Sequence, residues 1–146
     1  MLSSLRNNQY FVKEHVGMFK AANNYDIFDP QTNQKVFECR EPNLGFFTKL
    51  LRFTDYKRMT PFNLEIRTPD GQLVFSVKRG ISIFLSKVNV LDENGSIVGR
   101  FKQKLFSIGG KFEVLSPEDA TLCTLAGKWT SWDFRFIQNG SELASV

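Results

Sequence analysis

The chain has 146 residues, and its 19 Lys and Arg against 15 Asp and Glu give a formal net charge of +4. This length suits one domain, which we expect to span residues 1–146, and a 42% apolar content with mixed charge excludes a disordered chain. No apolar run approaches the roughly 20 residues that span a bilayer, because the longest covers only residues 81–85. Residues 1–6 lack the basic and apolar regions of a secretory signal.

The N-terminal part begins with a predicted strand over residues 10–15 and a loop that continues to residue 24. A hairpin follows, with strands at residues 25–28 and 35–39 around a turn at residues 29–33. Residues 41–61 interrupt this pattern. Within them Phe46, Phe47, Leu50 and Leu51 fall at helical spacing, which indicates a short helix.

From residue 62 onward a strand–turn–strand unit repeats four times. The strand pairs cover residues 62–66 and 73–77, 88–91 and 97–101, 112–115 and 122–125, and 134–137 and 143–146. Apolar residues alternate in these strands, and Asp-Gly and Asn-Gly pairs supply the positive φ angles that short turns require. Five hairpins make about ten strands, and such a sheet must curl, split or close. The sequence therefore predicts an all-β antiparallel meander that closes into a barrel, with the 15 Phe filling its interior.

Residue types that carry catalytic or metal chemistry are scarce. Cys39 and Cys123 lie far apart in strand-like segments, and we expect two buried free thiols rather than a disulfide. The single histidine, His15, offers neither a zinc site nor a nucleophile–histidine pair, and we expect a strand-end residue with no special role. The sequence therefore favours a protein that is not an enzyme and needs no metal or cofactor.

The connectors between hairpins combine cations with aromatic residues. If the repeats stack in register, these cations line up along one rim and form a surface for anions. The phosphates of acidic phospholipid headgroups are one candidate ligand, and single-stranded nucleic acid is another. The alternative is that the cations are ordinary solvated positions of alternating strands. The candidate headgroup-binding residues are Lys78, Arg79, Lys102, Lys104 and Lys128.

Residues 46–53 join apolar bulk to flanking cations, as helices at a membrane interface do. The alternative for this segment is a two-turn helix that packs into the domain core. The candidate membrane-interface residues are Phe46, Phe47, Lys49 and Arg52, together with Trp129 of a later connector.

Several phrases of the sequence, in this order, resemble the phospholipid scramblase-related proteins. They are GMFKAAN at residues 17–23, YDIFDP at 25–30, TKLLRF at 48–53, YKRMTPF at 56–62, VKRG at 77–80 and GKW at 127–129. This group belongs with the plant LURP-one-related proteins in the tubby C-terminal-like superfamily, and the resemblance extends from about residue 9 to residue 146. It implies a twelve-stranded antiparallel barrel around a central apolar C-terminal helix. It also implies a link to phospholipids, because tubby domains hold phosphoinositides through basic side chains.

The chain departs from the family pattern at its C-terminus. The acidic calcium-binding segment and the apolar helix of animal scramblases have no counterpart up to Val146, and the Pro-rich tail and palmitoylated cysteine cluster are also missing. We therefore expect a truncated domain that does not scramble lipids in response to calcium by itself. We expect the missing helix or a protein partner to fill the barrel, or else its own Phe side chains to collapse inward.

These observations predict a non-catalytic module that associates with acidic phospholipid or phosphoinositide headgroups. Its expected location is the cytoplasm, peripherally at the inner face of the membrane. The alternative is a soluble β-barrel interaction domain that binds a protein or an apolar ligand. Nucleic-acid binding is disfavoured, because the sequence contains no recognised nucleic-acid motif.

Overall fold

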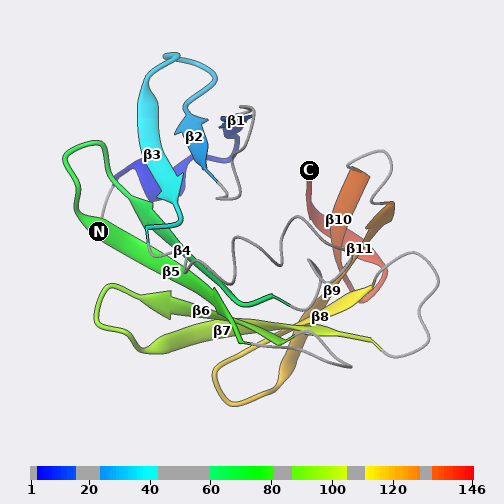
Figure 1. Ribbon diagram of the computed structural model, residues 1–146. Coiled ribbons are helices and arrows are strands. Elements are labelled where there is room, and N and C mark those ends of the chain that lie inside the picture. The colour runs from blue at the N-terminus through cyan, green and yellow to red at the C-terminus, as the bar shows by residue number, and fades with distance from the viewer. Residues whose placement is uncertain (1–2, 16–23, 43–59, 81–86, 105–110, 129–132) are drawn as a thin grey trace.

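The computed structural model describes residues 3–15, 24–42, 60–80, 87–104, 111–128 and 133–146. These residues contain a short 3-10 helix, η1 (Ser3–Arg6), and eleven strands in one antiparallel sheet (Figure 1). None of the described residues forms a helix with the length and apolarity needed to cross a membrane. The strands are β1 (Phe11–Glu14), β2 (Tyr25–Phe28), β3 (Lys35–Arg40), β4 (Phe62–Arg67), β5 (Leu73–Arg79), β6 (Lys87–Asp92), β7 (Ile97–Gln103), β8 (Phe112–Leu115), β9 (Thr121–Lys128), β10 (Asp133–Gln138) and β11 (Ser141–Ser145).

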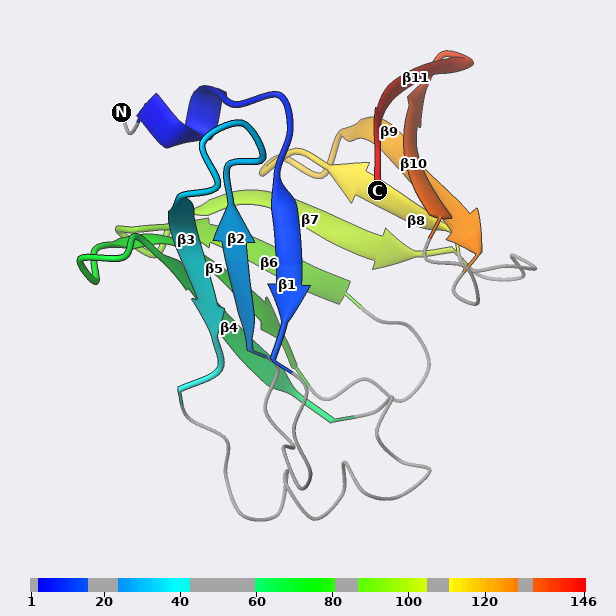
Figure 2. The ribbon, with the colours of Figure 1, turned by 90° about the horizontal axis from the view of Figure 1, so that it is seen from above.

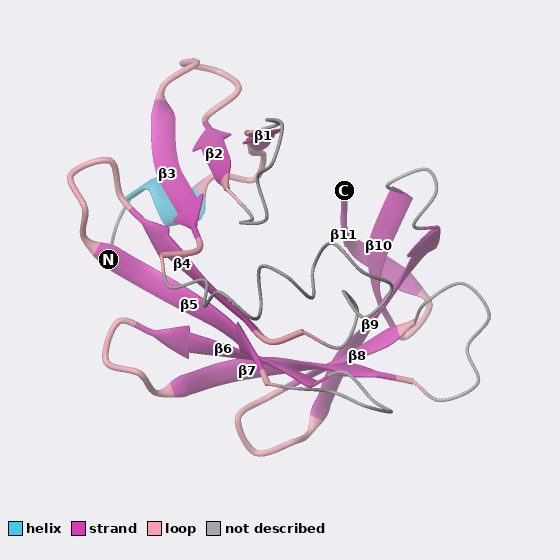
Figure 3. Cartoon of the chain, viewed as in Figure 1, coloured by secondary structure: helices cyan, strands magenta, loops and turns pink. Residues whose placement is uncertain are grey.

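The order of strands in the sheet is their order in the chain, from β1 to β11. The five predicted hairpins are present as β2–β3, β4–β5, β6–β7, β8–β9 and β10–β11, and the predicted N-terminal strand is β1. Figure 3 shows how strands and short turns alternate along the chain. The prediction of an all-β antiparallel meander is therefore confirmed. The helical spacing expected near Phe46 falls outside the described residues.

The three middle hairpins share one turn design that recurs every 24 residues. At its first position Thr68, Asp92 and Ser116 each accept a hydrogen bond from a backbone N–H four residues later, at 3.0, 2.8 and 3.2 Å. Three positions further on, the backbone enters the left-handed region at Gly71, Gly95 and Asp119, with φ of 93°, 82° and 63°. The last hairpin instead has positive φ at both Asn139 and Gly140, as a two-residue type I′ turn requires.

Each hairpin also has a register shift at the end of its first strand, next to the turn. The shifts lie at residues 27/28, 66/67, 90/91, 114/115 and 136/137. Such bulges bend a strand and increase its twist, and five of them curl the sheet in one sense. Figures 1 and 2 show the result, in which the first three strands and the last three stand on opposite sides of the curve.

The register separates the side chains of the central strands into two faces, because directly opposed residues lie on the same face. The apolar face carries Phe62, Leu64 and Ile66 of β4, Phe75 and Val77 of β5, Val88 and Val90 of β6, Phe101 of β7, Phe112 and Val114 of β8, Cys123 and Leu125 of β9, and Phe134 and Phe136 of β10. The opposite face, which we call the polar face, carries Asn63, Glu65, Ser76, Lys78, Lys87, Asn89, Arg100, Lys102 and Glu113, together with Leu91 and the buried Leu115.

Strands β1 and β11 are the two ends of the sheet order, and within the described residues no strand pairs with both. Every residue of these two strands is exposed. The sheet is therefore curled but open among the described residues, and the predicted closure into a barrel is not confirmed.

Candidate functional site

The two edges of the curled sheet, at the two ends of its strands, differ in charge. The turn edge consists of the residues between the strands of each hairpin, at 29–34, 68–72, 93–96, 116–120 and 139–140 (Figure 2). These turn residues include no Lys or Arg. Their acidic side chains are Asp29, Asp70, Glu93, Glu118 and Asp119.

The opposite edge, where one hairpin ends and the next begins, is the connector edge. Along β5 to β9 we consider the described residues within two positions of the strand ends at this edge. Their charged residues are all basic except Glu113. The cations there are Lys78, Arg79, Lys87, Lys102, Lys104, Lys111 and Lys128. The structure therefore places all five predicted headgroup-binding cations along one edge.

Three lysines of this edge also share the polar face, and we call Lys78, Lys87 and Lys102 the lysine cluster. Lys87 and Lys102 are directly opposed on β6 and β7. Lys78 is opposed to Asn89, two residues from Lys87, and is therefore a diagonal neighbour of Lys87 at roughly 7–8 Å. Lys78 and Lys102 are exposed and form no ion pair within the described residues.

Arg79 lies on the other face. It is directly opposed to Phe62, and its guanidinium carbon lies 4.7 Å from the centre of that ring. One of its Nη atoms donates a hydrogen bond to the backbone oxygen of Thr60 at 2.7 Å. The edge thus includes Arg79, but the lysine cluster does not.

The other predicted contacts have three different outcomes. Lys104 follows β7 and forms an ion pair with Glu113 on the polar face, with 3.3 Å between Nζ and Oε1. Lys128 is the last residue of β9, and its side chain is not among those that the structure describes. The predicted membrane-interface residues all lie outside the described residues. They are Phe46, Phe47, Lys49, Arg52 and Trp129.

Within the lysine cluster, Lys87 and Lys102 repel each other, although each also has an acidic neighbour, Asp119 beside Lys87 and Glu113 opposite Lys102. Two ammonium groups that are directly opposed in a sheet repel each other, at a cost of a few tenths of a kcal/mol up to about 1 kcal/mol. Local conflicts of this kind are often found at functional sites. An anion with several oxygens bridges such cations and removes the repulsion, so the cluster is a candidate anion-binding surface.

Lys87 and Arg100 belong to this surface but were not among the predicted residues. Arg100 is opposed to Asn89 on the polar face, and its side chain is only 15% exposed. Both positions follow from the sequence once the register is counted outward from the turn at Asn94 and Gly95. That count places Lys87 opposite Lys102. The composition of the connectors alone does not indicate this pairing.

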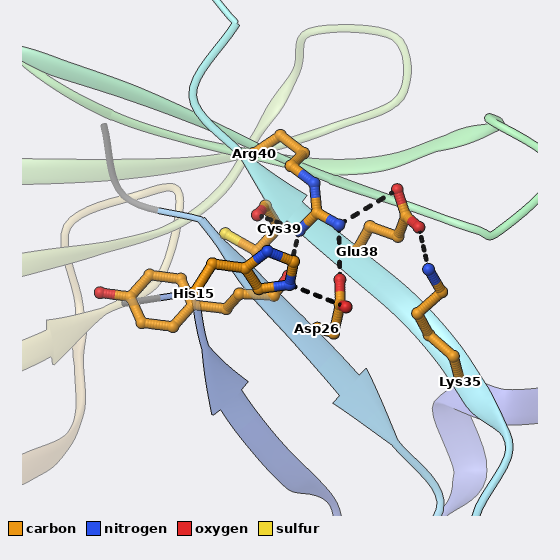
Figure 4. Close-up of polar contacts among 7 residues, drawn as sticks. His15, Asp26, Lys35, Glu38, Cys39 and Arg40 are labelled. Atoms are coloured by element: carbon orange, nitrogen blue, oxygen red, sulfur yellow. Dashed lines mark hydrogen bonds and ion pairs between the residues drawn. The ribbon is translucent and has the colours of Figure 1, made fainter. Parts of the chain in front are cut away.

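A second polar cluster joins β1, β2 and β3 at the start of the sheet (Figure 4). His15 follows β1, as expected, but its Nε2 lies 2.8 Å from Oδ2 of Asp26, and the other oxygen of Asp26 accepts a hydrogen bond from Arg40. Arg40 also contacts Glu38, which pairs with Lys35. Burial alone would raise the pKa of Asp26, but the hydrogen bonds from Arg40 and His15 outweigh it and hold the pKa below its ordinary value. His15 is thus a strand-end residue, as expected, and its contact with Asp26 links the end of β1 to β2.

This network predicts a pH-dependent contribution to stability. The folded-state pKa of Asp26 lies below the value of about 3.9 in an unfolded chain, so its contribution is present above that pH and is lost as the pH falls through the folded-state pKa. Asp26→Asn should lower the free energy of unfolding at pH 7 by about 1.5–3 kcal/mol. Urea unfolding at pH 7, 5 and 3 should show the difference between the two proteins narrowing below about pH 4. A difference that stays constant with pH would assign the stabilisation to something other than ionised Asp26.

Both cysteines are buried free thiols, as predicted, and burial raises the pKa of Cys39 and Cys123. The described residues bring together no group of three His, Cys, Asp or Glu side chains that could hold a metal ion.

In comparisons with known proteins, no family model, curated protein or solved structure matches the chain significantly.

Proposed function

We propose that this protein is a non-catalytic module that binds acidic phospholipid surfaces through its connector edge. The observation that supports this proposal is the separation of charge, with cations along β5 to β9 at the connector edge and only acidic charges in the five turns. An anionic surface attracts the first edge and repels the second. The strands then stand upright on the membrane, with the lysine cluster among the phosphates and the turns facing the solvent.

The lipid chemistry agrees with this arrangement. The cytoplasmic leaflet carries acidic lipids, and each Lys or Arg close to it contributes about 1 kcal/mol of attraction. We therefore propose a cytoplasmic protein that associates peripherally with the inner face of the membrane. The proposed ligands are phospholipid or phosphoinositide headgroups, in keeping with the resemblance to the scramblase-related proteins.

A closed barrel is part of the same proposal, and strand parity supports it. In an antiparallel meander with an odd number of strands, β1 and β11 run in the same direction, so pairing them directly would require a parallel pair. One further strand between them would be antiparallel to both. The twelfth strand that the resemblance implies would provide it. That strand would also cover β1 and β11, whose residues are all exposed.

Vesicle flotation tests the proposed function. We expect the protein to float with vesicles of phosphatidylcholine and phosphatidylserine at low salt, and not with vesicles of phosphatidylcholine alone. Raising the ionic strength from about 0.1 M to about 1 M shortens the screening length from about 10 Å to about 3 Å and should release the protein. Absence of binding to both kinds of vesicle would rule the proposal out.

A second candidate function is an interaction domain whose apolar face binds an apolar helix, such as the one expected at the barrel centre, or an apolar ligand. The observation in its favour is that most apolar-face residues of β4 to β10 are only half-buried. In the described part of the chain, the buried apolar residues are Phe37, Cys39, Val74, Leu115, Cys123 and Phe134. In the flotation experiment this function predicts no preference for acidic vesicles.

A further inference from the structure

Asp119 occupies an unusual position beside the lysine cluster. It lies in the turn between β8 and β9, and because β8 ends opposite Arg100, this turn is level with the middle of β7. Its Oδ1 lies 2.8 Å from Nη1 of Arg100 and 3.7 Å from Nζ of Lys87. The carboxylate therefore neutralises two cations of the polar face, Arg100 in the middle of β7 and Lys87 at the connector edge, although the chain places it in a turn.

The repeated turn requires a positive φ at this position, which glycine adopts at less cost than aspartate does. The corresponding positions in the two preceding turns are Gly71 and Gly95, which adopt positive φ without cost. Asp119 adopts φ of 63° at the same position, a conformation that non-glycine residues enter less readily. The exposed fraction of its side chain is 58%, so burial does not explain its presence. What distinguishes Asp119 from the two glycines is its pair of cationic contacts.

Arg100 is held ready for an anion by a second contact. The same Nη1 that meets Asp119 donates a hydrogen bond to the backbone oxygen of Pro117 at 2.7 Å. The exposed fraction of the Arg100 side chain is 15%, whereas that of Lys87 is 50%. A partly buried guanidinium beside an exposed ammonium is a common arrangement for binding phosphate oxygens.

We propose that Arg100 and Lys87 form a phosphate-binding site in which the carboxylate of Asp119 is the resident counter-ion that an incoming phosphate group displaces. The inference rests on the proposed function for the lipid source of that phosphate. A carboxylate and a phosphate offer the same charge-assisted acceptor oxygens, so both compete for one pair of cations. Asp119 thereby sets the affinity of the connector edge and keeps Lys87 and Arg100 paired when no ligand is bound.

The test removes the charge of Asp119 while keeping the turn. Asp119→Asn retains a residue that tolerates positive φ, and Asp119→Gly restores the residue found in the two related turns. Each variant should bind phosphatidylserine-containing vesicles about fivefold more tightly than the unmodified protein, the gain expected when one cation near an anionic surface is released. A parallel titration with inorganic phosphate, followed through the NMR signals of the Arg100 and Lys87 side chains, should show a gain of the same order.

Glu118→Gln is the matched control, because it removes one negative charge from the neighbouring position of the same turn. Glu118 is exposed and forms no ion pair within the described residues. A gain with both Asp119 variants but not with Glu118→Gln supports the site. If the gain occurs only with vesicles, the phosphate comes from lipid headgroups, and if it occurs only with inorganic phosphate, the site takes a free phosphate.

No gain with either probe, or an equal gain with Glu118→Gln, overturns the inference. Failure of the unmodified protein to bind acidic vesicles would instead reject the proposed function. The inorganic phosphate titration would then still decide whether Asp119 is displaced by an anion.

Discussion

Gly127→Ala should destabilise the protein by about 3 kcal/mol, the upper end of what overpacking usually costs. Gly127 lies in β9 directly opposite Phe134 of β10. A methyl group at Gly127 would lie 2.2 Å from the backbone oxygen of Asp133, 2.5 Å from a ring carbon of Phe134 and 2.8 Å from its Cα. Two of these three atoms belong to the backbone of a paired strand, so the clash cannot be relieved by turning a side chain.

The buried ring of Phe134 explains why this position is a glycine. With an exposed fraction of 7%, Phe134 is one of the buried apolar residues of the described strands, and its ring occupies the space above Gly127. An aromatic ring packed over a glycine on the neighbouring strand compensates for the side chain that the glycine lacks. The substitution therefore disturbs both the β9–β10 pairing and one of the main apolar contacts of the C-terminal strands.

Gly99→Ala is the matched control for this prediction. Gly99 also lies within a strand, but a methyl group there would meet only the backbone oxygen of Leu115, at 3.3 Å. We expect a change of less than about 1 kcal/mol in the free energy of unfolding, measured by urea titration with an unchanged slope. Similar values for Gly99→Ala and Gly127→Ala would contradict the close approach of β10 to Gly127.

The hairpins could be predicted from the sequence because their determinants are local. Alternation of apolar residues and turn residues such as Asn139-Gly140 act within about ten residues, and each expected hairpin is present. Closure of the sheet depends instead on where β1 and β11 lie relative to each other. That geometry accumulates from twist and bulges over the whole meander, and local sequence patterns do not specify it.

The side chains of the candidate site could likewise be predicted only as far as local sequence patterns determine them. Lys78 and Arg79 are adjacent in the chain and were grouped as headgroup contacts, but successive side chains of a strand point to opposite faces. The alternation of side chains along a strand therefore already places Lys78 and Arg79 on opposite faces. Only the register with β6 and β7 shows that Lys87, and not Arg79, lies beside Lys78 and Lys102. The contact of Asp119 with Arg100 joins two hairpins and depends on the stagger between β7 and β8, which the turn sequences do not encode.

The double variant Lys78→Gln/Lys102→Gln should weaken binding to phosphatidylserine-containing vesicles by about 30-fold, because each lost cation removes about 1 kcal/mol of attraction. Both side chains are exposed, and neither forms an ion pair within the described residues, so the fold should tolerate their loss. Removing Lys102 relieves its repulsion with Lys87 but also removes its attraction to the directly opposed Glu113, so the free energy of unfolding should change little. Weaker binding without lower stability is the result that assigns these lysines to ligand contact.

Lys35→Gln/Arg67→Gln provides a control with the same change in net charge at the other edge. Lys35 begins β3 and Arg67 ends β4, so both lie next to the turns, and each forms an ion pair with a nearby glutamate. The six-residue strands β3 and β4 separate Lys35 and Arg67 from the connector edge by about 20 Å, which exceeds the screening length of about 10 Å at 0.1 M salt. We therefore expect a change of less than about threefold in vesicle binding for this variant. Equal losses in the two double variants would mean that net charge alone drives binding, and the separation of charge between the two edges would then have no role in orienting the protein.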